Sequence, residues 1–410
     1  MTRDAFDLPV SAATQSQAAA YDAYVLEFLS YGAGIRDYFS AVDNTCDAPL
    51  LNAHAAALHL AFEGAEGWHH AAPFLEKMSA AKTPMTERET LFCSAVLAWA
   101  EKDFPTTMAL LDELTVRWPA DLCAIKWGQY HAFNLGDQPA LLRFGQRAKV
   151  AHEDRPYVHG MIAFALEQNH DLDGAFEEGM HATEIALDDA WAHHAVAHVF
   201  ETRGDIAKGA KWMARCAHTW SDKGVFIRDH NWWHTALFHL QAGDQQSALG
   251  IFDTYLWGEW PEFPQEQIGA ISMLWRMEMR GIDVGTRWTP VVEEARKRAG
   301  ERILPFHDLH YLYALARAGS DEETKTMQQS IAEHAQTASG RTEVAWRDAA
   351  VPAADGIVAF ARGDYEAATE HLGAAMPELY RVGGSHAQRH LFEEVRQTAA
   401  LMAGDTAQSA

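Results

Sequence analysis

The chain has 410 residues, of which 48% are hydrophobic and 22% are charged. This length suits one large domain or two to three ordinary ones, and the composition has no signature of disorder. The formal net charge of -24 would repel phosphate backbones and anionic lipid headgroups, so we expect neither nucleic acid nor a membrane as a partner.

The sequence shows no recognisable targeting or membrane segment. No apolar run reaches the roughly 18 residues that a membrane helix needs, and residues 1–21 lack the apolar core of a signal peptide. The four cysteines are scattered and form no CxxC pair, which favours buried thiols in a reducing compartment. They are Cys46, Cys93, Cys123 and Cys216. We therefore expect a cytoplasmic protein.

Turn signals recur along the chain at a regular spacing. An Asp preceded by Lys, Gly or His recurs every 34 residues, at Asp103, Asp137, Asp171 and Asp205. Gly243-Asp244 repeats the pattern 39 residues later. Each site separates two apolar helical patterns, because a left-handed residue ends one helix and Asp caps the next. A helix-turn-helix unit of 34 residues is the tetratricopeptide period.

Strand signals are almost absent, so this period predicts an all-α, tetratricopeptide-like helical-repeat solenoid. We expect a strongly curved or closed array of antiparallel helix pairs. N-terminal helices over residues 1–50 would lead into regular repeats over 51–257. Divergent repeats would follow over 258–402, and residues 403–410 would form a disordered tail.

The first candidate site lies on the helix expected over residues 191–203. His194, His198 and Glu201 fall on one face of it, within an arc of roughly 60°. Two imidazoles and a carboxylate at this spacing would bind a divalent metal, or would pair an acid-base His with an orienting Glu. The alternative is a hydrogen-bonded stripe with a structural role only.

The second candidate site begins the corresponding helix of the following repeat. His230 and His234 share one helical face, and Asn231 and Trp233 lie beside them as candidate ligand contacts. Because first helices of successive repeats stand side by side, we expect both His pairs to converge in one pocket with an apolar Trp wall. Alternatively, the Trp side chains belong to the core and the imidazoles bond to backbone carbonyls.

A third pattern, Asp308 and His310, has two interpretations. Asp308 caps the helix that follows, or it sets the tautomer of His310 as a general-base pair requires. These two residues complete the candidate catalytic set of His194, His198, Glu201, His230, His234, Asp308 and His310.

Two C-terminal patterns suggest contacts with an anion. Gly383-Gly384-Ser385 leads into a helix, and Arg389 follows one turn later, so helix amides and a guanidinium would bind a carboxylate or phosphate. The plain alternative is a connecting turn. Arg347-Asp348 would be either a buried ion pair that supports the array or a second substrate clamp.

Several of these stretches resemble the tetratricopeptide repeat protein 38 family. They are His194–Glu201, His230–Leu237, Gly281–Trp288, Arg347-Asp348 before Val351-Pro352, and Gly383–Arg389. The resemblance extends from about Leu8 to about Met402 with the motifs in the family's order. It implies a closed or strongly curved helical-repeat protein and says little about activity.

The expected function is binding of a small anionic metabolite in a His-, Trp- and acid-lined pocket, with His acid-base chemistry on it as an extension. The alternative is a tetratricopeptide scaffold that binds a peptide or protein partner without catalysis. No P-loop, GxGxxG, HExxH or GxSxG motif is present, so we expect no nucleotide cofactor. Binding of zinc or another divalent metal is possible, and so is a homo-oligomer.

Overall fold

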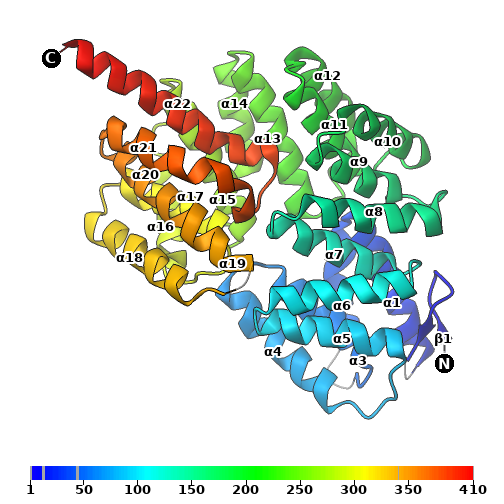
Figure 1. The fold of residues 1–410 in the computed structure, drawn as a ribbon. Coiled ribbons are helices and arrows are strands. Elements are labelled where there is room, and N and C mark those ends of the chain that lie inside the picture. The colour runs from blue at the N-terminus through cyan, green and yellow to red at the C-terminus, as the bar shows by residue number, and fades with distance from the viewer. Residues whose placement is uncertain (1, 12–13, 43–45, 340, 410) are drawn as a thin grey trace. The chain divides into compact units, whose positions relative to one another are not determined.

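The computed structural model describes residues 2–11, 14–42, 46–339 and 341–409. Almost every described element is a helix, and the strands β1 and β2 are a two-residue antiparallel pair. The chain divides into two compact units, residues 1–132 with 138–231 and residues 133–137 with 232–410. The all-α repeat fold is therefore confirmed for the described residues (Figure 1).

The first unit contains most of the regular repeats, and the division falls within α7 and α13. Its elements are β1 (Thr2–Arg3), β2 (Pro9–Val10), α1 (Gln15–Ser30), η1 (Ala33–Arg36), α2 (Asp37–Ala41), α3 (Pro49–Leu60), α4 (Ala65–Ala80), α5 (Glu87–Ala100), α6 (Phe104–Arg117), α7 (Leu122–Asn134), α8 (Gln138–His152), α9 (Val158–Gln168), α10 (Leu172–Ile185), α11 (Ala190–Thr202), α12 (Ile206–Cys216), η2 (Ala217–Thr219) and α13 (Val225–Gln241).

The second unit holds the remaining helices, with wider or tighter turns at η3, η4 and η5. Its elements are α14 (Gln245–Ile251), η3 (Phe252–Leu256), α15 (Pro264–Met279), α16 (Trp288–Arg298), α17 (Pro305–Arg317), α18 (Asp321–Thr337), α19 (Arg341–Val344), η4 (Ala345–Ala350), α20 (Val351–Ala361), α21 (Tyr365–Ala375), η5 (Met376–Val382) and α22 (His386–Ser409). α22 extends to Ser409, over most of the range expected to be a disordered tail.

The turns predicted to recur every 34 residues separate the two helices of each repeat. α5, α7, α9, α11 and α13 are the first helices, and α6, α8, α10, α12 and α14 are the second helices. The residue before each Asp has a positive φ, including the non-glycine residues Lys102 (60°) and His170 (63°). Asp103 and Asp171 then accept hydrogen bonds from the amides of Thr106 and Gly174, as N-caps do.

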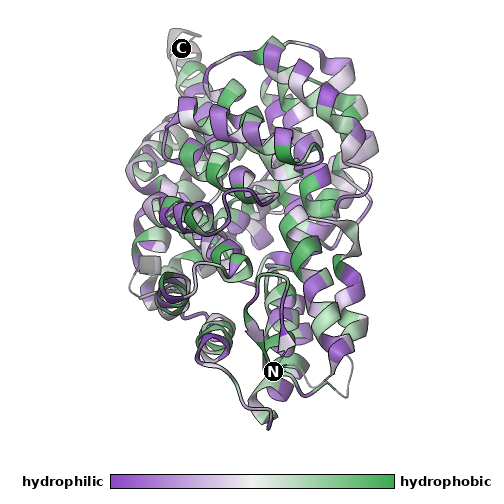
Figure 2. Ribbon diagram, turned by 90° about the vertical axis from the view of Figure 1, so that its right-hand side faces the viewer, coloured by the Kyte–Doolittle hydropathy of each residue, from purple (hydrophilic) through white to green (hydrophobic). Residues whose placement is uncertain are grey.

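The helices in front in Figure 2 carry both hydrophilic and hydrophobic residues along their length. The second helices bury one face only, whereas the first helices α9 and α11 bury nearly every residue. A one-sided stripe is typical of a surface helix, and burial on all sides marks a helix inside the fold. The first helices are therefore interior elements.

The N-terminal segment packs along the first helices of the first unit. Its Tyr24 hydroxyl lies 3.0 Å from Nδ1 of His54 in α3. Phe28 stacks on Trp127 of α7, and Tyr31 stacks on Trp191 of α11. The N-terminal helices expected over residues 1–50 therefore contact the first helices α3, α7 and α11.

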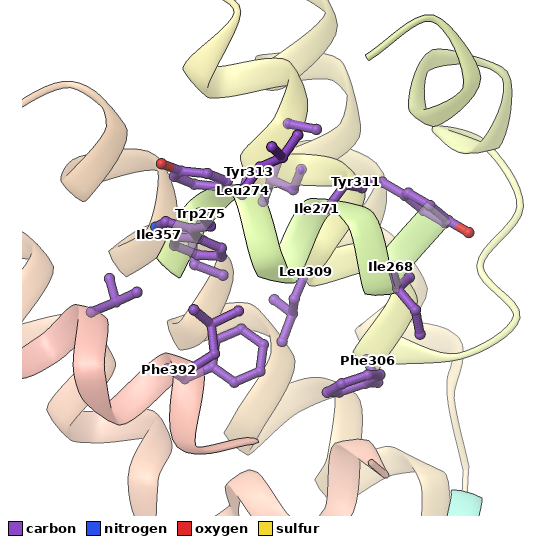
Figure 3. Close-up of a cluster of buried hydrophobic side chains, with 14 of the residues drawn as sticks. Ile268, Ile271, Leu274, Trp275, Phe306, Leu309, Tyr311, Tyr313, Ile357 and Phe392 are labelled. Carbon is purple, nitrogen blue, oxygen red and sulfur yellow. The ribbon is translucent and has the colours of Figure 1, made fainter. Parts of the chain in front are cut away.

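The core of the second unit lies between α15, α17, α20 and α22 (Figure 3). Trp275 and Tyr313 stack with their ring centroids 3.4 Å apart, and Phe306 meets Phe392 edge to face. These rings and the aliphatic side chains around them are buried. Burial of apolar area of this kind is the main source of stability for such a layer.

Candidate functional site

Helix α11 presents two histidines one turn apart inside the first unit. Asp189 caps the helix by accepting hydrogen bonds from the amides of Trp191 (3.1 Å) and Ala192 (2.9 Å). His194 and His198 follow on one face, and each is only 1% exposed. Their Nε2 atoms lie 2.9 Å apart. The i, i+4 spacing predicted from the sequence therefore brings both imidazoles together.

Helix α13 adds the second pair. Nε2 of His230 lies 3.1 Å from Nε2 of His194, and the His230 side chain is partly exposed. α13 continues without a break through His234, which follows His230 by one turn and is fully buried. One ring nitrogen from each of His194, His198, His230 and His234 can be chosen so that all four lie within 4.8 Å of one another. We call these four residues the histidine cluster.

Aromatic side chains of the first unit lie against His194 and His230. The rings of Trp191 and Phe164 lie 4.5 Å and 5.2 Å from that of His194. Phe226 stacks on His230 at 5.8 Å. Apolar walls lower the local dielectric and strengthen the interactions of a charge bound among them. The sequence had suggested Trp233 for this role, but Trp233 belongs to the hydrophobic core of the second unit.

A carboxylate that the sequence analysis missed lies beside the cluster. Oε2 of Glu167, on α9, is 3.5 Å from Nδ1 of His198, and Glu167 is fully buried. Glu167 also lies one 34-residue period before Glu201, which the sequence analysis had chosen to orient a histidine. The repeat itself was therefore the signal that could have found it.

Asn231, expected to contact a ligand, instead contacts the backbone. Its side-chain amide donates to the carbonyl of Ala190 at 3.0 Å, which joins α13 to the start of α11. Asn231 is fully buried. This hydrogen bond gives Asn231 a structural role beside the cluster.

Asp308 and His310 are both buried in the second unit on α17. Oδ2 of Asp308 lies 2.6 Å from Nη1 of Arg302. His310 Nδ1 lies 2.8 Å from the carbonyl of Phe306 in its own helix. Burial lowers the pKa of His310 to about 3. These contacts describe an ion pair and a helix-bonded neutral histidine rather than an aspartate that sets a histidine tautomer.

The Gly383–Arg389 turn directs its polar groups inward. Ser385 and Gln388 cap each other's backbone, as in a capping box, and Arg389 donates to the carbonyl of Gly384. A Cβ on Gly384 would lie 2.8 Å from the Phe306 ring, which explains the glycine. The groups expected to bind an anion are therefore used to close the turn.

Arg347 and Asp348 form the expected ion pair at the protein surface. Two hydrogen bonds of 2.7 Å and 2.8 Å join the guanidinium to the carboxylate. The Arg347 side chain is 53% exposed, so the prediction of a buried pair is wrong. An exposed pair of this kind contributes about 1 kcal/mol or less.

The arrangement limits what the histidine cluster can do chemically. Burial, with a smaller contribution from the Arg276 guanidinium, lowers the pKa of His234 to about 3, so this imidazole is neutral near pH 7. Neutral imidazoles bind metals or accept protons. Three of the four side chains are at most 1% exposed, however. Of the four side chains, His230 alone is partly exposed.

No protein-family model matches the chain. Similar solved structures include a human IFIT1 dimer with m7Gppp-AAAA, at 11% identity and a TM-score of 0.45, over 97% of this chain and 88% of that one. The APC/C hetero-tetramer Cut9-Hcn1 gives 12% identity and a TM-score of 0.47, over 92% and 69%. The TPR domain of P58(IPK) is 10% identical with a TM-score of 0.21, over 78% of this chain and 99% of that one. The assignment of the fold rests on the chain's own repeats.

No described helix has both the length and the apolar character that are needed to cross a membrane.

Proposed function

We propose that the chain is a non-catalytic helical-repeat protein that binds a protein or peptide partner. Its resemblance to the tetratricopeptide repeat protein 38 family implies a helical-repeat fold and points to no particular reaction. The candidate catalytic and anion-binding groups also support this proposal, because Asp308, His310, Ser385 and Arg389 are engaged in bonds that hold the fold together.

The observation that carries the proposal is a set of three exposed apolar residues at or just after the C-terminal ends of successive second helices. Val116 and Val150 lie 34 residues apart in the last turns of α6 and α8, and Leu187 follows two residues after the end of α10. We call these three residues the exposed row. Their side chains are 59%, 87% and 66% exposed. Single exposed apolar residues need no explanation, but their recurrence around the end of the second helix in three successive repeats favours a contact surface.

The charge of the chain indicates the class of partner. With a net charge of -24, the protein attracts a cationic segment and repels an acidic one. We therefore infer a partner with Lys or Arg around apolar residues that meet the row. The first helices are less suited to this contact, because α1 and its neighbours pack along them in the first unit.

Fluorescence anisotropy with a panel of labelled peptides tests this function. Peptides that combine basic and apolar residues should bind, and their affinity should fall as salt rises. Val150→Asp should weaken binding by about tenfold or more, the scale of an interface hot spot. The matched control is Val42→Ala, which changes a buried valine. Equal binding by wild type and Val150→Asp would contradict the proposed surface.

A second candidate is a small anionic metabolite that binds at His230. It is supported by the partial exposure of His230 and by the short contact of its ring with His194. Calorimetry with a panel of dicarboxylates and phosphate esters tests it. Binding that His230→Ala abolishes would favour the metabolite over the peptide, and absence of binding in the panel would exclude it.

A further inference from the structure

We propose that the histidine cluster binds one divalent transition-metal ion in a closed, structural site, with zinc as the best-suited metal. This inference concerns a site separate from the exposed row of the proposed function. His194 and His198 come from α11, and His230 and His234 come from α13. Four neutral imidazoles fill a tetrahedral shell and leave no open position for a substrate.

The nitrogen positions fit a metal ion. Zn-N bonds of 2.0–2.1 Å place two tetrahedral ligands roughly 3.3–3.4 Å apart. The Nε2 atom of His194 lies 2.9 Å from that of His198 and 3.1 Å from that of His230. An ion would therefore need the rings of these two pairs to separate by a few tenths of an ångström. The four ligand nitrogens, which lie within 4.8 Å of one another, would also have to draw closer around it.

The protons of the imidazoles also favour an ion. A ring nitrogen of neutral imidazole has either one hydrogen or one lone pair. Nε2 of His194 faces two other Nε2 atoms at hydrogen-bond distance, so it cannot donate to one and accept from the other. A cation among these nitrogens accepts a lone pair from each ring, and the protons of His194, His198 and His230 then reside on their Nδ1 atoms.

Glu167 supplies the outer contact that such a site requires. Metal-binding histidines usually donate their second N-H to a carboxylate or carbonyl, which orients the ring. The Glu167 carboxylate lies 3.5 Å from Nδ1 of His198, on the side of the ring away from Nε2. Its negative charge is fully buried and offsets part of the charge of a divalent ion.

The ligand set selects the class of metal. Calcium and magnesium require oxygen ligands, and the cluster offers imidazole nitrogens. Imidazole suits zinc, copper and nickel, and a four-coordinate shell closed by protein ligands is typical of structural zinc. The site would hold α11 and α13 together, because the free energy of metal binding adds to the free energy of folding.

The test uses the full chain without a histidine tag. Elemental analysis of the purified protein should find about one equivalent of zinc, copper or nickel per chain. After removal of the metal with a chelator, titration with Co²⁺ should give the intense visible bands of a four-coordinate ion. Zn²⁺ should displace these bands at one equivalent and should raise the melting temperature.

Two ligand variants and one control locate the site. His198→Gln and His230→Gln should each weaken Zn²⁺ binding by about tenfold or more, because even outer contacts are worth that much. The control is the double variant His69→Gln/His70→Gln, an exposed pair on α4 with ring centroids 5.5 Å apart. It should bind Zn²⁺ as the wild type does.

Three results would overturn the inference. They are a folded wild type that binds no transition metal, a weak six-coordinate Co²⁺ spectrum, and an equal loss of affinity in the control. If the His198→Gln variant does not fold, two measurements still decide the question. They are Zn²⁺ binding by the His230→Gln variant, which changes a partly exposed side chain, and the Co²⁺ spectrum of the wild type.

Discussion

The carboxylate of Glu167 lies 3.5 Å from Nδ1 of His198, although the two residues belong to different repeats. Both side chains are at most 1% exposed. This contact links α9 to the histidine cluster of α11 and α13. It makes Glu167 the positioning residue of the proposed metal site.

Glu167→Gln should preserve the fold and weaken Zn²⁺ binding by about 10–100-fold, because the carboxylate orients His198 and raises its basicity. Competition with a chromophoric chelator measures this change. The control is Glu178→Gln, which alters another Glu-His contact, to His159 at 2.5 Å. Equal affinity in wild type and Glu167→Gln would remove Glu167 from the site.

Arg88→Met should lower the free energy of unfolding by about 3–5 kcal/mol, because it leaves the buried Asp121 without its cation. Arg88 lies 2.5 Å from Asp121 and also donates to the Pro9 carbonyl of β2 at 2.8 Å. Urea unfolding measures the loss. Arg347→Met, which breaks an exposed pair, should cost about 1 kcal/mol or less. Similar costs for both variants would contradict the stated role of burial.

Gly128→Ala should destabilise the first unit by about 1–3 kcal/mol through overpacking. A Cβ at this position of α7 would lie 2.4 Å from the ring of Phe144 in α8. Gly250 in α14 has nothing within 4 Å of its Cβ position, so Gly250→Ala should instead stabilise by about 0.5–1 kcal/mol. Thermal unfolding of the two variants should therefore move in opposite directions, and a shift of the same sign would contradict this packing.

Lys126 should make the stability depend on pH. Burial lowers the pKa of Lys126 from its ordinary value of 10.5 to about 7. Between these values the unfolded chain binds a proton that the folded chain lacks, so the free energy of unfolding rises with pH. The slope from this residue is at most about 1.4 kcal/mol per pH unit.

Urea unfolding between pH 7 and 8.5 should show this slope in the wild type and a smaller one in Lys126→Met. The range stays below the ordinary thiol pKa of 9.0. Lys208, 68% exposed, provides the control Lys208→Met, which should retain the wild-type slope. Equal slopes in all three proteins would contradict the burial of a neutral Lys126.

The features that follow from the repeat period were predictable from the sequence. The turns at Asp103, Asp171 and Asp244 cap helices as predicted. His194 and His230 meet because first helices of successive repeats lie side by side, and each of these two helices carries its histidine in its second turn. Local spacing and one packing rule were sufficient for these conclusions.

Contacts that depend on distant partners were beyond the sequence patterns. Asp308 pairs with Arg302 rather than with His310, and Arg389 turns back to the Gly384 carbonyl. In each case the side chain forms an ion pair or a hydrogen bond with a nearby polar group inside the fold. Helical spacing in the sequence does not reveal that partner. The packing of Phe28 on Trp127 likewise joins residues about 100 positions apart.

The proposed metal site is tested most directly by X-ray absorption at the zinc edge of the zinc-loaded full chain. The account predicts four nitrogen ligands at about 2.0–2.1 Å with the outer scattering of imidazole rings. A sulfur ligand at about 2.3 Å, or a six-coordinate shell of oxygen, would contradict the assignment of zinc to His194, His198, His230 and His234.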